Sequence, residues 1–265
     1  RRQEGEVRRP SPDGHTLHSV NLHEIGLGVF AKMRQLGRDV CHLELDLLGT
    51  DPNGQDRGPE EAAEVVKKVV DAVNVPVVVW GTANNQKDEE VLKAISEKCQ
   101  GMNLGLAPVE EGNHKGVGAS ALGYNHTVVA SSPIDVNLAK QLNILISDMA
   151  LPLERVLMDP TTGALGYGLE YSFSVMERLR LAALQGDSMT QQPMICFVGE
   201  ESWRQKESKV GEGVPETWGD WYKRAVMWEA TTAISLLNAG ADIITLRHPD
   251  NVPIVKSAIE KLMAT

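Results

Sequence analysis

The amino-acid sequence predicts an α/β protein of the single (βα)8 or TIM-barrel class, and three observations lead to that prediction. Its 265 residues are close to the roughly 250 residues typical of one such barrel. Short apolar or β-branched segments alternate with longer amphipathic segments, which is the pattern of βα units. The predicted strands also run directly into turn-forming and polar residues, as loops at the carboxyl end of a barrel do.

Eight strands are expected from short segments rich in Val, Ile, Leu and Met, a composition that suits buried parallel strands. They are residues 17–22, 40–47, 75–80, 102–107, 127–130, 155–158, 194–198 and 243–246. The first is the least regular, because it alternates with His18 and His23 and because Gly26 and Gly28 weaken the helix that should follow. The alternative architecture is a flavodoxin-like doubly wound sheet.

The helices between these strands carry apolar residues at helical spacing. Residues 62–73 follow two glutamates that suit the positive end of a helix dipole. Residues 134–149 follow Ser132 and Pro133, which favour a helix start. The same pattern recurs in residues 171–184, 222–237 and 252–263. These helices are expected to form the outer layer of the barrel.

Composition limits the classes of partner. Hydrophobic residues make up 42% and charged residues 23%, as in ordinary soluble domains. The net charge of −10, from 26 basic and 36 acidic residues, argues against binding to nucleic acid or to an anionic membrane. Residues 75–80 form the longest apolar run, far below the roughly 20 residues of a membrane helix. We expect a cytoplasmic protein, with a polar N-terminal arm at residues 1–14, which lack a secretory signal, and a TIM-barrel domain at residues 15–265.

Neither the three cysteines nor the histidines predict a metal site. Cys41, Cys99 and Cys196 lack the short spacing of zinc or iron-sulfur ligands, so they are expected to be reduced core residues. The sequence also shows no Walker loop, Ser-His-Asp arrangement or helical histidine pair. We therefore predict neither catalytic residues nor metal ligands in this chain.

The most distinctive segment directly follows the predicted strand 155–158. It consists of Asp159, Pro160, Thr161, Thr162, Gly163, Ala164, Leu165, Gly166 and Tyr167. Glycines allow backbone amides to approach a ligand closely, and threonine hydroxyls add hydrogen-bonding groups. The segment is predicted to face a ligand. The alternative is a tight turn with capping threonines, in which the Asp159 carboxylate caps the turn.

Polar residues after the other strands add further candidate binding residues. They are Asn84, Ser131, Ser132, Glu200, Arg247 and His248. Arg247 is suited to pair with a carboxylate or phosphate, and His248 to transfer protons, although a structural role for this pair stays open. Glu200 begins a polar segment of about 20 residues, and long ordered loops are usually functional.

Several segments carry a family resemblance. They are residues 134–143, 158–167, 176–187, 228–233 and 247–249. In this order they resemble the small (delta) subunit of the corrinoid iron-sulfur protein. The resemblance covers residues 39–265 and is strongest from His126 onward, whereas residues 1–38 do not share it clearly.

The resemblance implies a TIM barrel that pairs with a large subunit carrying a [4Fe-4S] cluster, the two together holding a cobalamin in the carbon monoxide dehydrogenase/acetyl-CoA synthase pathway. The cobalt of such a complex accepts a methyl group from a methyl-tetrahydropterin through a methyltransferase and delivers it to acetyl-CoA synthase. These two enzymes are the implied transient partners. The small subunit is implied to be a component of the methyl-transferring complex without an active site of its own.

A corrin is a flat ring edged with amides, so the backbone amides and hydroxyls of the segment after residue 158 suit it. A rival hypothesis is a pterin-binding methyltransferase that acts on its own, with Asn84 and Asp159 as pterin ligands. Binding or demethylation of a methylpterin by the chain alone would distinguish the two. A purely structural scaffold is the third hypothesis, and the sequence leaves open whether the donor is bacterial folate or an archaeal analogue.

Overall fold

Five parallel strands form the main sheet of the computed structural model, which describes residues 42–163, 165, 166 and 168–264. Each strand pairs with the next one along the chain. They are β1 (Leu43–Asp46), β2 (Val77–Trp80), β3 (Gly105–Val109), β4 (Thr127–Ser131) and β5 (Val156–Asp159). The three valines of β2 are all buried, as expected of a parallel strand covered on both faces.

Two further strands continue this order. β6 (Ile195–Cys196) and β7 (Ile243–Ile244) pair in parallel, and a parallel bridge between Met158 and Met194 joins β5 to the segment that enters β6. The last strand also approaches the first through side chains. The Arg247 guanidinium lies 3.5 Å from the Asp46 carboxylate. Within the described ranges no backbone pairing links β7 to β1.

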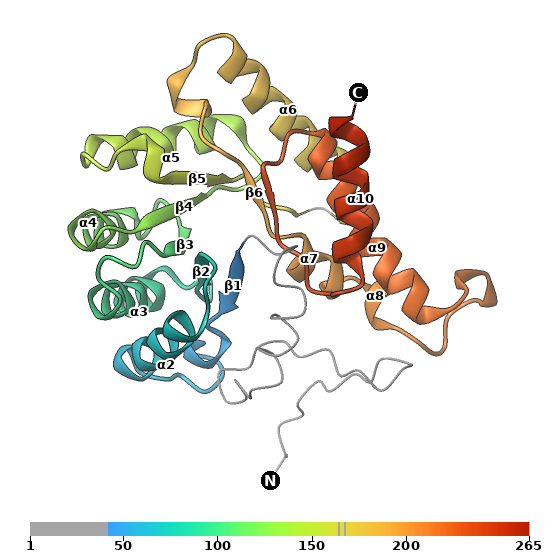
Figure 1. The fold of residues 1–265 in the computed structure, drawn as a ribbon, viewed down its shortest axis with the longest axis horizontal. Coiled ribbons are helices and arrows are strands. Elements are labelled where there is room, and N and C mark those ends of the chain that lie inside the picture. Colours follow the sequence, from blue (N-terminus) through green and yellow to red (C-terminus); the bar gives the residue numbers. More distant parts are fainter. Residues whose placement is uncertain (1–41, 164, 167, 265) are drawn as a thin grey trace.

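Helices follow the strands, and most of them lie on the outer side of the sheet (Figure 1). They are α2 (Pro59–Ala72), α3 (Asn85–Lys98), α4 (His114–Tyr124), α5 (Val136–Asp148), α6 (Glu170–Leu184), α7 (Val198–Arg204), α8 (Lys206–Lys209), α9 (Trp221–Asn238) and α10 (Asn251–Met263). Four short 3-10 helices, η1 (Leu48–Thr50), η2 (Leu153–Arg155), η3 (Ser188–Thr190) and η4 (Glu216–Trp218), complete the described elements. No helix in the described part of the chain is long and apolar enough to cross a membrane.

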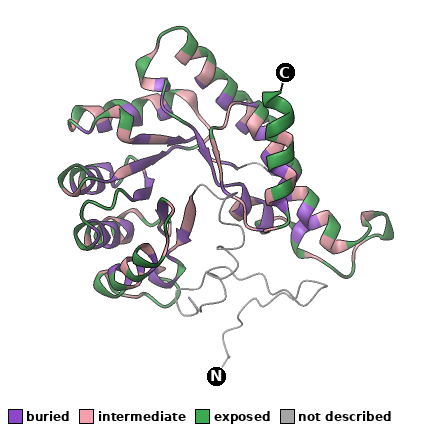
Figure 2. Cartoon of the chain, viewed as in Figure 1, coloured by how far each residue is buried: buried purple, intermediate pink, exposed green. Residues whose placement is uncertain are grey.

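The strands bury side chains on both faces (Figure 2). Val77 and Val79 belong to the outer core, which packs against the helices. Val78 points to the opposite face, where it joins an inner cluster with Ala107, Val129, Ile195 and Phe197. The Trp80 ring lies against the Phe197 ring, with centroids 4.1 Å apart. The inner cluster therefore connects β2 with the segment after β6, which a flat sheet in this strand order would keep far apart.

The strand order rules out the flavodoxin-like alternative. A flavodoxin-like sheet requires a change of direction in the strand order, whereas the observed order is sequential, so that alternative is wrong. Seven of the eight predicted strands are observed at their predicted places. The predicted strand at residues 17–22, the N-terminal arm at residues 1–14 and Cys41 lie outside the described residues. Cys99 and Cys196 are buried and free, as predicted.

Two local predictions need correction. The helix predicted from residue 134 begins at Val136, because the Asp135 carboxylate, rather than Ser132 and Pro133, caps it by accepting from Asn137 N at 2.7 Å. The polar segment after Glu200 is not an irregular loop, since α7 and α8 occupy its first half.

Candidate functional site

Most of the predicted site residues gather where the parallel strands end, which we term the carboxyl edge. The last residues of its strands are Asp46, Trp80, Val109, Ser131, Asp159, Cys196 and Ile244. Ser131 and Asp159 are register partners on neighbouring strands, so their side chains face the same way. This edge is where ligands bind in α/β barrels.

Asp159, the last residue of β5, is a buried acid of this edge, with 4% of its surface exposed. Its carboxylate accepts a hydrogen bond from Thr161 N at 3.0 Å. Burial raises the pKa of Asp159 to about 7, against the lowering effects of Thr161 N–H and the Ser131 side chain, and nearby Glu200 adds to the rise. Asp159 therefore caps its own turn and also supplies a carboxyl group that gains a proton near neutral pH.

The segment after β5 is tied to its surroundings by its own polar groups. The Thr161 hydroxyl donates to the Ser132 carbonyl, and the Ser172 hydroxyl donates to the carbonyls of Thr161 and Gly163 at 3.2 and 3.1 Å. Thr161 has a positive φ of 65°, a conformation that such a network holds in place. This geometry is the tight turn considered as the alternative, in which Thr161 and Gly163 are half-buried.

The remaining predicted residues of that segment differ in exposure. Thr162 is buried, with its side chain against Cys196. Leu165 is also buried, whereas Gly166 is exposed and has a φ of 85°. Ala164 and Tyr167 lie outside the described residues.

Three carboxyl groups meet on the inner side of β1. One oxygen from each of Glu44, Asp46 and Glu200 lies within 4.8 Å of the other two. Burial raises the pKa of Glu44 well above its usual value, with the Asp46 charge adding to the rise and the Thr245 side chain opposing it. Burial also raises the pKa of Glu200. The Arg247 charge opposes both shifts, so this group combines two carboxyl groups of raised pKa, those of Glu44 and Glu200, with one cation.

A second buried acid fixes the loop after β7. Glu229, on α9, is fully buried and accepts hydrogen bonds from the backbone N–H groups of Arg247 and His248 and from the Asn251 amide. Burial raises the pKa of Glu229, and these donors oppose the rise. The Arg247 guanidinium is thereby aimed back across the edge towards Asp46.

His248 occupies an aromatic stack. Its ring lies parallel to that of Trp203, with centroids 5.8 Å apart, and edge-on to that of Tyr222 at 5.3 Å. Its Nδ1 accepts from Asp250 N at 3.1 Å, and the residue is only 4% exposed. This placement fits the structural role that the sequence left open for His248.

Asp88, on α3, holds the loop after β2 as Glu229 holds the loop after β7, by accepting hydrogen bonds from it. Its carboxylate accepts from Thr82 N at 2.8 Å and from the Thr82 hydroxyl at 3.0 Å. A Cβ atom at Gly81 would lie 2.5 Å from the Asp88 carboxyl carbon, so only glycine fits there. The predicted ligand Asn84 is exposed and caps α3, accepting from Lys87 N at 3.1 Å.

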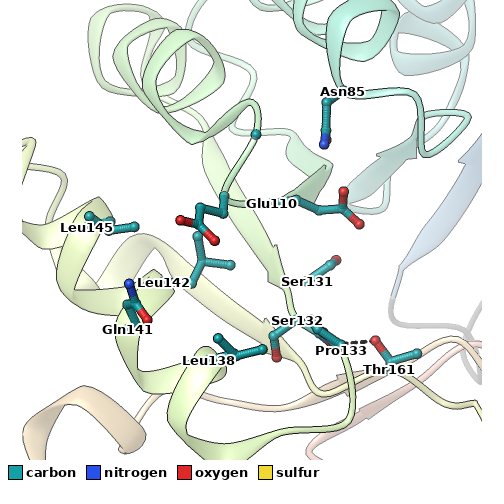
Figure 3. Close-up of a pocket in the computed structure, with 12 residues that line it drawn as sticks. Asn85, Glu110, Ser131, Ser132, Pro133, Leu138, Gln141, Leu142, Leu145 and Thr161 are labelled. Carbon is teal, nitrogen blue, oxygen red and sulfur yellow. Dashed lines mark hydrogen bonds between the residues drawn. The ribbon is translucent and has the colours of Figure 1, made fainter.

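A pocket of about 380 Å³ opens between the carboxyl edge and α5 (Figure 3). Polar groups of the strand ends form one side of it, and leucines of α5 form the other. Its lining consists of Asn85, Glu110, Glu111, Gly112, Ser131, Ser132, Pro133, Leu138, Gln141, Leu142, Leu145 and Thr161. Of the predicted residues, it brings together Ser131, Ser132 and Thr161.

Asn85 and Glu110 are pocket residues that the sequence prediction missed. The Asn85 amide points towards the Glu110 carboxyl group (Figure 3) and donates to it. Burial raises the pKa of Glu110, and the Asn85 hydrogen bond opposes the rise. A Cβ atom at Gly112 would lie 2.4 Å from the Asn85 side-chain nitrogen, so the glycine makes room for this amide. The signal available in the sequence was a polar residue a few positions after a strand, the same signal that selected Asn84.

Comparison with known sequences gives one consistent family. The family model described as CO dehydrogenase/acetyl-CoA synthase delta subunit matches residues 32–258. The chain is 38% identical over 228 residues to the acetyl-CoA decarbonylase/synthase complex subunit delta of Methanosarcina mazei, covering 84% of the chain and 52% of that protein. It is 38% identical over 229 residues to the subunit delta of Methanopyrus kandleri, covering 86% of the chain and 56% of that protein. The chain thus spans about half the length of these relatives.

Comparison with solved structures shows which known fold this chain resembles. A Yersinia pestis dihydropteroate synthase with a pterine-sulfa conjugate superposes with a TM-score of 0.60 at 12% identity, covering 93% of this chain and 91% of that one. The dihydropteroate synthase of Thermus thermophilus gives a TM-score of 0.57 at 18% identity, covering 91% and 90%. At these identities the likeness concerns the arrangement of strands and helices.

Proposed function

Because this chain belongs to the CO dehydrogenase/acetyl-CoA synthase delta subunit family, we propose that it is the non-catalytic small subunit of a heterodimeric corrinoid iron-sulfur protein. It holds a cobalamin jointly with a large subunit. The pair relays a methyl group from a methyl-tetrahydropterin to acetyl-CoA synthase. Under this proposal the cobalamin supplies the methyl-accepting cobalt, and this chain supplies the surface that binds and orients the ring.

The carboxyl edge fits the amide-bearing rim of a corrin. A carboxyl group that keeps its proton near neutral pH can both donate and accept, which matches a carboxamide. Asp159 has such a pKa, at about 7. Glu44 Oε1 and Asp46 Oδ1 are buried and make no hydrogen bond to the described residues, so the edge holds acceptors for added amide N–H groups. This unused hydrogen-bonding capacity is the observation that carries the proposal.

The iron-sulfur cluster belongs to the partner in this proposal. A [4Fe-4S] cluster needs four thiolates, and the chain has three cysteines. Of these, Cys99 and Cys196 are each buried, and burial raises the pKa of Cys196 to about 12. Such thiols keep their protons and do not ligate metal.

The proposed architecture is a closed (βα)8 barrel. Seven sequential strands, an inner cluster that joins β2 to the segment after β6, and the Arg247–Asp46 contact support it. The likeness to dihydropteroate synthases supports the same arrangement of strands and helices.

Co-expression with a cluster-bearing large subunit tests the function. Size-exclusion chromatography with visible absorption should give a coloured one-to-one heterodimer that loses the corrinoid bands when this chain is omitted. Arg247→Glu, at the edge, should lower corrinoid retention, whereas Arg178→Glu, exposed on α6, is the control. Corrinoid uptake by the large subunit alone, at the level of the pair, would refute the proposal. A colourless monomer that turns over a methylpterin would establish the rival methyltransferase instead.

A further inference from the structure

We propose that the pocket between the carboxyl edge and α5 is a docking site for an arginine side chain of a partner protein. The ligand class is an aliphatic guanidinium, which is a flat cation with N–H donors on its edge and an apolar stem. The proposal goes beyond the corrinoid function, because it concerns how this chain alone recognises a polypeptide. Such a contact would fix the position of the partner beside α5.

The charge of the pocket favours a cation. Glu110 and Glu111 both line it, and none of its described lining residues is Lys, Arg or His. The nearby Asp88 charge adds to the rise of the Glu110 pKa, and no cation of the described part of the chain opposes that rise. A phosphate or carboxylate would be repelled by these acids, whereas a cation would offset charges that no lining residue offsets.

The acceptors of the pocket suit a cation with several donors. Asn85, Glu110 and Ser132 come from three separate elements around the cavity (Figure 3). The Asn85 amide donates to Glu110, and its Oδ1 atom is buried without a partner among the described residues. The Ser132 hydroxyl, in a residue 4% exposed, likewise has no partner there. A guanidinium carries five N–H donors in a fixed fork and an ammonium only three, so a guanidinium can serve acceptors on more than one element.

The leucines of α5 offer a surface to the apolar stem. Leu138, Leu142 and Leu145 lie on one face of the helix and line the pocket. An arginine side chain packs its methylene groups on apolar surface and keeps a flat, weakly hydrated head for the acceptors. A lysine ammonium is compact and strongly hydrated, so it loses more on entering a pocket with an apolar wall. The cavity of about 380 Å³ is within the range of sites that hold small ligands.

The rim of the pocket favours a side chain of a protein over a free guanidine. Three of the lining residues, Pro133, Leu138 and Gln141, are exposed, and Leu138 is 41% exposed. The main chain and neighbouring residues of a bound arginine would cover this rim and remove apolar surface from water. A free guanidine is too short to do so.

Isothermal titration calorimetry of the full chain with the capped tripeptide acetyl-Gly-Arg-Gly-amide tests the proposal. The matched probe carries citrulline, in which a carbonyl oxygen replaces one nitrogen of the guanidinium and the charge is lost. We expect the arginine peptide to bind at least about tenfold more tightly, because its paired N–H groups make charge-assisted hydrogen bonds to a carboxylate. The corresponding lysine peptide should bind about threefold or more weakly than the arginine peptide. Propylguanidine, which is the arginine side chain without the peptide, should also bind more weakly.

Two substitutions locate the binding to this pocket. Glu110→Gln should weaken binding of the arginine peptide about tenfold or more, since the charged acceptor is lost. Leu138→Ser should weaken it about threefold or more, since the stem loses its apolar contact. Glu97→Gln, exposed on α3, is the matched control and should leave the affinity unchanged.

Equal affinity for the arginine and citrulline peptides, no binding of the arginine peptide up to about 10 mM, or unaltered binding by a folded Glu110→Gln variant would each overturn the proposal. Equal binding of the lysine peptide would overturn the assignment of a guanidinium. Propylguanidine binding as tightly as the peptide would overturn the assignment of a partner side chain. If Glu110→Gln does not fold, as judged by circular dichroism, Leu138→Ser and the comparison of probes on the wild-type chain still decide.

Discussion

Replacing Asp159 by asparagine should make the stability of the protein less dependent on pH. The pKa of the buried carboxyl group is about 7, against 3.8 when it is in water. The folded state thus binds the proton more tightly than the unfolded state does. Its contribution to stability is complete below pH 3.8 and is lost as pH rises towards 7. At about 1.4 kcal/mol per pKa unit, the free energy of unfolding should fall by about 2–3 kcal/mol between about pH 5 and about pH 8 from this group.

Urea unfolding followed by tryptophan fluorescence at these two pH values measures the effect. Asp159→Asn keeps an oxygen that can accept from Thr161 N–H, so the turn should persist while the titration disappears. Between the two pH values, the free energy of unfolding of the variant should therefore fall by about 2–3 kcal/mol less than that of the wild type. Asp148→Asn, exposed at the end of α5, is the control. Parallel pH profiles for wild type and Asp159→Asn would refute the assignment of a raised pKa to this residue.

Three further substitutions test the loops of the carboxyl edge. Glu229→Gln should lower the free energy of unfolding by about 2–4 kcal/mol, because an amide NH2 would face buried N–H donors; urea midpoints equal to those of the exposed control Glu177→Gln would contradict this anchoring role. Asn84→Ala should lower the free energy of unfolding by about 1 kcal/mol, because a helix cap is lost, and should leave corrinoid uptake unchanged. Lower corrinoid uptake at an unchanged Tm would instead make Asn84 a corrinoid ligand. Gly199→Ala should lower the free energy of unfolding by about 1–3 kcal/mol in a thermal melt, because its Cβ would lie 2.6 Å from Arg247 N. An unchanged Tm would show that the segments at Gly199 and Arg247 can move apart without loss of stability.

The sequence predicted the order of the elements well, because that order depends on local patterns. Buried parallel strands such as β2 need continuous apolar runs, and the helices need apolar residues at helical spacing, and both are visible along the chain. Helix boundaries were less predictable. The start of α5 depends on which of several neighbouring residues caps it, and Asp135 prevailed over Ser132 because its carboxylate reaches two backbone N–H groups.

The candidate site was only partly predictable, because it is formed by register across strands. Asp159 was selected from its place after a strand, and the structure brings it beside Ser131. Glu44 and Asp46 were missed, since they lie inside a strand whose inward face is not marked in the sequence. Asn84 and Asn85 differ by a single position on one turn, and only the backbone path decides which one caps the helix and which one lines the pocket.

The acids that anchor the edge loops have a consequence for how this surface can change over evolutionary time. Asp88 and Glu229 accept mainly from backbone N–H groups, which every residue except proline provides. The loop paths are thereby independent of most side chains that the loops display. A lineage could exchange Thr82 or Arg247, and with them its ligand or partner, without having to invent a new loop conformation.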